Sequence, residues 1–247
     1  MTEAAGAPYV ARPDDAREDR RQFGLLGALL GAASLVMAST TCVTAAIPEI
    51  GRELSATQTE IQWIADAYPV VLAALLLPAG ALLDRYGRRR GLVAGLLVLV
   101  GALLWSGLAG SPGELIASRC LAGVGGALVF PATLATITSV LGPQRRSRAV
   151  ALWAASVMAG GGYGLVLSGA MVELSSWGAA FVVIAAMAGA CLIAALLAVP
   201  ETRDPEHAHI DPLGGVLSLV AIGALTWISG AFFRPCLSGV RRAGSCS

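Results

Sequence analysis

The chain has 247 residues, of which 56% are hydrophobic and only 13% are charged. A soluble domain carries about 25% charged residues, so this composition excludes an ordinary soluble domain and is typical of an integral membrane protein. All 17 basic residues are arginines, and the formal net charge of +1 is uninformative. Only the placement of the arginines along the chain indicates how the protein is oriented in the membrane.

In chain order, the sequence predicts a polar tail over residues 1–22 and then a series of apolar segments. A transmembrane helix needs about 20 mostly apolar residues. Segments of this kind occupy residues 23–47, 61–83, 91–110, 115–138, 149–172, 178–199 and 213–233. We therefore expect an all-α integral membrane protein with a six-helix bundle over 23–199, a loop over 200–212 and a seventh transmembrane helix over 213–233.

The last segment, residues 234–247, departs from this pattern. It loses hydrophobicity abruptly and carries three arginines on the side of the membrane where the other loops have few. We interpret it as an atypical tail that results from truncation or a frame shift.

The arginines predict the orientation in the membrane. Four lie in the tail 1–22, four in the loop 84–90, three in the loop 141–148 and one in the loop 201–212. The alternate loops, at 48–60, 111–113 and 173–177, contain Arg52 alone. Because cytoplasmic loops carry the excess of basic residues, we expect a plasma-membrane protein whose amino terminus is cytoplasmic.

Two charged residues lie inside predicted spans. Asp66 is five residues from the start of the second span and Arg119 is four residues from the start of the fourth. Both spans run in the same direction, so the two charges lie about 6–8 Å below the same boundary. One interpretation is that they face a common cavity, where Asp66 exchanges a proton beside Arg119. The alternative is that each side chain reaches the interface and serves only as an anchor.

Polar and small residues near this depth are candidates to line the cavity. Hydroxyl groups of the first span either bond back to the carbonyl four residues earlier or face the cavity. The candidate lining residues are Ser39, Thr41, Thr44, Gln62, Trp63, Gly164 and Gly169. The chain shows no catalytic triad, phosphate loop or metal-ligand spacing, so we expect no enzyme, no metal and no cofactor. We also expect no nucleic-acid partner.

The charged reversal between the second and third spans, at residues 80–92, resembles the signature of the major facilitator superfamily. The run from Arg119 to Ala127 resembles the arginine motif of the fourteen-helix drug:proton antiporter branch of that superfamily, whose arginine is implicated in proton coupling. The resemblance covers roughly residues 23–232 and implies the six-helix amino-terminal bundle of a major facilitator fold. It also implies a cytoplasmic gate made of Gly80, Asp84, Arg85, Gly87, Arg88 and Arg89.

The chain departs from this branch at several positions. Ser39 stands where the branch has an aspartate, and Thr44 stands where it has an asparagine. These differences either weaken proton coupling or shift it onto Asp66. The branch moves substrate between two halves that rock against each other, whereas this chain corresponds to one half.

The resemblance therefore implies proton-coupled efflux of small amphipathic or cationic drugs by a truncated half that pairs with a second copy or a separate second half. The alternative is a non-transporting membrane remnant or partner subunit.

Overall fold

The computed structural model describes residues 13–140 and 143–199, and every described segment of regular structure is helical. The predicted loop 200–212, seventh helix 213–233 and tail 234–247 lie outside the described residues. The six helices are α1 (Pro13–Glu53), α2 (Gln58–Tyr86), α3 (Arg88–Gly107), α4 (Pro112–Val140), α5 (Pro143–Leu174) and α6 (Trp177–Ala198). Each is long and apolar enough to cross a membrane, which confirms the predicted six-helix bundle.

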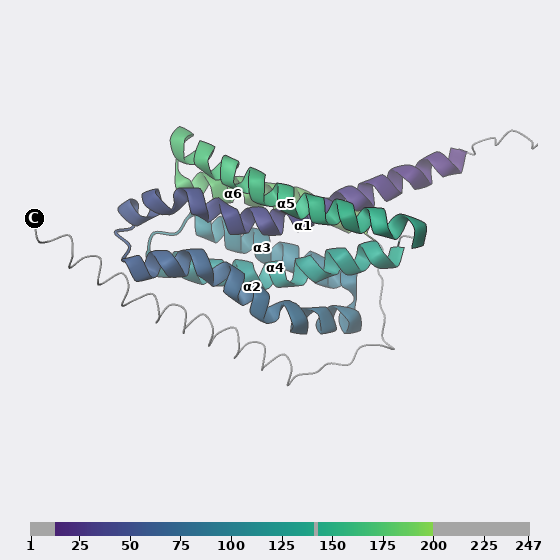
Figure 1. Ribbon diagram of the computed structural model, residues 1–247, viewed down its shortest axis with the longest axis horizontal. Helices are drawn as coiled ribbons and strands as arrows, with labels where there is room; N and C mark the ends of the chain where they lie inside the picture. The colour runs from purple at the N-terminus through teal and green to yellow at the C-terminus, as the bar shows by residue number, and fades with distance from the viewer. Residues whose placement is uncertain (1–12, 141–142, 200–247) are drawn as a thin grey trace, which may run out of the picture.

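Most helices of the bundle are longer than the apolar segments that predict them, because polar residues continue them beyond the apolar part. Helix α1 begins at Pro13, inside the tail that the sequence predicts over 1–22, and projects beyond the bundle (Figure 1). Helix α2 begins with a capping box, in which the Thr57 hydroxyl accepts from the Glu60 N–H and the Glu60 carboxylate accepts from the Thr57 N–H. A capping box pairs backbone donors that have no partner within the helix.

Short connections make successive helices run in opposite directions. The α2–α3 turn, the last residues of α4 and the first residues of α5 lie at the end of the bundle from which α1 projects, and the α1–α2, α3–α4 and α5–α6 turns lie at the opposite end (Figure 1). Arginines of the two arginine-rich connections are therefore gathered at one end, as their alternation along the sequence predicts. The central helices are α1, which packs against α4, α5 and α6, and α4, which also packs against α2 and α3.

Small residues allow α1 and α5 to approach closely. A Cβ atom added at Gly160 of α5 would lie 2.1 Å from the Ser34 carbonyl oxygen of α1, and one added at Gly164 would lie 2.5 Å from the Thr41 hydroxyl. The Thr41 hydroxyl donates to the Gly161 carbonyl at 3.0 Å. Within a bilayer, helices associate through such close packing and interhelical hydrogen bonds. Only part of the glycine-rich run of α5 serves this contact.

We predict that Gly160→Ala destabilises the bundle by about 1–3 kcal/mol, because the added methyl group would overlap a backbone carbonyl that cannot move aside without shifting α1. Gly162→Ala is the matched control, since nothing lies within 4 Å of a Cβ at that exposed position. The measurement is the apparent melting temperature of each purified variant in detergent. Equal melting temperatures for the two variants would contradict the close α1–α5 contact.

Candidate functional site

The charged reversal is tighter than the sequence predicts. Its residues 84–90 were expected to form a seven-residue turn, but α2 continues to Tyr86 and α3 begins at Arg88, so Gly87 alone joins the helices. Gly87 has φ 110° and ψ 132°, a conformation that a residue with a Cβ atom rarely adopts. Its N–H donates to the Leu83 carbonyl at 2.9 Å, and its own carbonyl accepts from the Gly91 N–H at 3.1 Å. The backbone hydrogen bonds of α2 and of α3 therefore both include Gly87.

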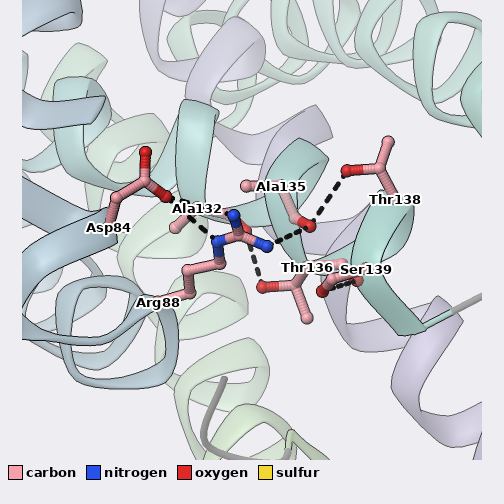
Figure 2. A network of polar contacts seen from close by, with 7 residues as sticks. All are labelled: Asp84, Arg88, Ala132, Ala135, Thr136, Thr138 and Ser139. Atoms are coloured by element: carbon pink, nitrogen blue, oxygen red, sulfur yellow. Dashed lines mark hydrogen bonds and ion pairs between the residues drawn. The ribbon is translucent and has the colours of Figure 1, made fainter. Parts of the chain in front are cut away.

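Arg88 links the reversal to α4. Its Nε and Nη2 lie 3.3 and 3.1 Å from the same carboxylate oxygen of Asp84, one turn earlier in the chain. Its Nη1 donates to the Ala135 carbonyl of α4 at 3.0 Å. Figure 2 shows the guanidinium between these two partners, where the Ala135 carbonyl also accepts from the Thr138 hydroxyl. One planar side chain thus joins the end of α2, the start of α3 and the last turns of α4.

Arg89 makes the corresponding contact with α6, because its Nη2 donates to the Leu196 carbonyl at 2.7 Å. The last carbonyls of a helix have no partner within that helix, and arginine can satisfy them. Of the other predicted gate residues, Arg85 stacks over the ring of Tyr86 at 5.7 Å, and Gly80 has nothing within 4 Å of an added Cβ. Arg88 and Arg89, at the start of α3, therefore link this helix to α4 and α6, which both pack against it.

Arg119 lies in the interior of the bundle and is fully buried. Its Nη1 donates to the Ser39 carbonyl of α1 at 2.7 Å. Its guanidinium carbon lies 4.7 Å from the ring centroid of Tyr68 on α2 and 5.9 Å from that of Phe181 on α6. Its Nε and Nη2 have no hydrogen-bond partner among the described residues. Because none of this side chain reaches the surface, the interpretation of Arg119 as an interfacial anchor is wrong.

Asp66 and Arg119, which one sequence interpretation places beside each other in a common cavity, do not form an ion pair, although α2 and α4 pack against each other. Arg119 contacts Tyr68, which follows Asp66 by two residues. Side chains two residues apart on an α-helix point about 200° apart, so Asp66 is directed away from the arginine. The Asp66 side chain is half-buried, and in the described part of the chain its carboxylate has no hydrogen bond or ion pair.

The candidate cavity-lining residues fall into two groups. The Ser39 hydroxyl donates to the carbonyl four residues earlier at 2.7 Å, as the alternative without a cavity predicts. The Thr41 hydroxyl, which donates to Gly161 of α5, also lies 3.3 Å from the carbonyl four residues earlier. Gly164 is buried against Thr41. The second group, away from these contacts, comprises Thr44, Gln62 and Trp63, which are exposed, and Gly169, which has nothing within 4 Å of an added Cβ. Their role in a cavity stays a prediction.

The sequence interpretation missed the aromatic surroundings of Arg119 and two tryptophan contacts. Sequence interpretation gives Tyr68 and Phe181 no role beside the arginine. Trp153 of α5 donates to the Thr133 hydroxyl at 3.1 Å, and Trp177 of α6 donates to the Glu53 carboxylate at the opposite end of the bundle. The available signal was an intramembrane arginine with aromatic residues at a similar depth on other spans. Metal-ligating side chains do not gather in groups of three or more anywhere in residues 13–140 and 143–199.

Residues 29–240 match the family model described as Major Facilitator Superfamily. The chain belongs to this superfamily. It is 34% identical to the multidrug efflux pump LfrA of Mycolicibacterium smegmatis over 87% of this chain and 43% of that protein. It is also 34% identical to the cephamycin export protein CmcT of Amycolatopsis lactamdurans, over 78% of this chain and 40% of that protein.

A third relative, the puromycin resistance protein pur8 of Streptomyces alboniger, is 33% identical over 85% of this chain and 42% of that protein. The chain therefore spans less than half the length of these relatives. The fold matches that of a bacterial homologue of the human lysosomal transporter Spinster, solved in an inward-facing, unoccupied conformation. The TM-score is 0.64 and the sequence identity is 20%, over 79% of this chain and 45% of that one. The predicted family and the multi-pass membrane architecture are confirmed.

We predict that Arg88→Lys destabilises the bundle by about 1–2 kcal/mol, because an ammonium group cannot bond Asp84 and the Ala135 carbonyl in the forked geometry of a guanidinium. Arg146→Lys, at an exposed position on α5, is the matched control. The check is the melting temperature of each variant in detergent. A melting temperature for Arg88→Lys that equals that of the control would show that the α3–α4 link contributes nothing to stability.

Proposed function

We propose that this chain is part of a transporter that exports small amphipathic or cationic molecules from the cell in exchange for protons. Support comes from the relatives, which are named for multidrug efflux, cephamycin export and puromycin resistance, and which match over most of this chain. The matched region is less than half of each relative, so complete transport requires a second six-helix half, supplied by another copy of this chain or by another polypeptide.

The observation that carries the proton-coupling part of the proposal is the position of Asp66. Among the described acidic residues it lies farthest from a helix end, eight residues after the start of α2, while the others lie within six residues of an end. An ionised group at membrane depth is costly unless it is paired or hydrated. Asp66 is half-exposed and unpaired among the described residues, so it is open to a proton or a cation arriving from an aqueous cavity.

Arg119 has a different part in this proposal. It contributes a fixed positive charge inside the bundle, on the other side of Tyr68 from Asp66. In this proposal, protonation of Asp66 releases a bound cation, and loss of the proton on the other side of the membrane restores the site. The exposed residues Thr44, Gln62 and Trp63 contribute further contacts to the same cavity.

The proposed orientation has the amino terminus and the arginine-rich reversal in the cytoplasm. It is supported by the gathering of seven arginines, those at 85, 88–90, 145, 146 and 148, at one end of the bundle. In this position, Gly80 and residues 84–89 form a gate at the cytoplasmic end, and movement of α2 or α3 there would have to break the contacts of Arg88 and Arg89 with α4 and α6.

We predict that Asp66→Asn abolishes pH-dependent efflux, because an amide cannot bind or release a proton. The measurement is export of a fluorescent lipophilic cation from cells that express the chain, at several external pH values and with a protonophore. The control is Glu173→Gln, which removes an exposed acid at the end of α5. Unchanged pH dependence in Asp66→Asn would refute its role in coupling. No efflux above the vector control in the unmutated chain would favour the non-transporting alternative.

We predict that Arg146→Cys, in a background without the five native cysteines, reacts with a membrane-impermeant maleimide in inverted vesicles but not in intact cells. The positive excess at that end places it on the cytoplasmic side. Glu173→Cys, at the opposite end of α5, serves as the control with the reverse pattern. Labelling of Arg146→Cys from outside intact cells would reverse the proposed orientation.

A further inference from the structure

Arg119 is enclosed by aromatic rings, and no acidic side chain forms an ion pair with it in the described part of the bundle. Tyr68 and Phe181, which supply the rings, are both fully buried. A guanidinium within about 6 Å of a ring centroid is attracted to the negative face of the ring, and more strongly when water is excluded. At 4.7 Å from its guanidinium carbon, the ring of Tyr68 is the closer of the two.

Helix α1 holds both members of this contact in place. The Ser39 carbonyl accepts from Arg119, and the Val36 carbonyl accepts from the Tyr68 hydroxyl at 2.8 Å. The two carbonyls are three residues apart, so they lie on the same side of α1 in adjacent turns. The arginine and the tyrosine are thus tied to one short stretch of a third helix.

Helix α4 provides the space that Tyr68 occupies. Arg119, Gly123 and Gly126 are spaced by four and three residues, which places them on one face of the helix. A Cβ atom at Gly123 would lie 2.8 Å from the Tyr68 carbonyl oxygen, and one at Gly126 would lie 2.7 Å from the Tyr68 hydroxyl oxygen. The arginine is therefore followed on its own face by two positions without side chains, and the tyrosine of α2 packs there.

We propose that Tyr68 is a positioning residue for Arg119: its ring holds the guanidinium in the place of an acidic partner, and Gly126 leaves the room that the ring requires. An aromatic ring does not titrate as a carboxylate does. The partner of Arg119 therefore stays the same when the proton occupancy of the cavity changes. This role in coupling rests on the proposed function, whereas the positioning itself is a property of the bundle and can be measured without efflux.

The test is the rate at which phenylglyoxal modifies Arg119 in the purified chain in nanodiscs, measured by mass spectrometry of the peptide that contains it. In the unmutated chain we expect Arg119 to be protected, because its guanidinium is fully buried and stacked. Tyr68→Leu removes the ring and Gly126→Ala displaces it, so both are expected to raise the rate by roughly tenfold. Tyr68→Phe keeps the ring and loses the hydroxyl with its bond to Val36, so Arg119 is expected to stay protected.

Gly91→Ala separates positioning from general loosening. It crowds the Leu83 side chain at the α2–α3 junction, about 22 Å along α2 from Tyr68, so it should lower the melting temperature and leave Arg119 protected. The proposal is overturned if Tyr68→Leu and Gly126→Ala leave the rate unchanged, if Gly91→Ala raises it as much as they do, or if Tyr68→Phe raises it fully. If Tyr68→Leu does not fold, the comparison of Gly126→Ala with Gly91→Ala decides the outcome. If the unmutated chain shows no efflux while its Arg119 is protected, that result counts against the proposed function and not against the positioning of Arg119 by Tyr68.

Discussion

A charged side chain inside a bundle of apolar helices must find all its partners within the protein, because the surrounding hydrocarbon offers none. Arg119 meets this constraint with one backbone carbonyl and two aromatic rings. These come from α1, α2 and α6, so the position of one guanidinium depends on four helices at once. In a lipid environment, where apolar surfaces drive little association between helices, such contacts fix which faces meet.

The same constraint acts at the end of the bundle where the arginines gather. Arg88 and Arg89 each donate to a backbone carbonyl near this end, Ala135 of α4 and Leu196 of α6. The Leu196 carbonyl is one of the last four of α6, which have no partner within that helix. The family signature thus has partners within this half of the transporter fold. Its charges stabilise the junction of α2, α3, α4 and α6, and any gating movement at this junction has to exchange these hydrogen bonds for others.

Small residues make both arrangements possible. Gly87 allows α2 and α3 to meet with a single connecting residue, and Gly123 and Gly126 leave the space for Tyr68. On α5, Gly160 and Gly164 bring the helix against α1, whereas a Cβ atom added at Gly162 or Gly169 of the same run would have nothing within 4 Å. Glycines that look equivalent along the sequence therefore differ in what they do.

The sequence alone determined the number of described spans, their alternation, the gathering of arginines at one end and the family, because all of these depend on local composition and on motifs that are continuous in the chain. It also brought Asp66 and Arg119 to the same depth, since the rise per residue is constant. Only the tertiary structure decided that they do not pair. The direction of a side chain around a helix is settled by which neighbour packs on each face, and here Tyr68 rather than Asp66 packs against the arginine.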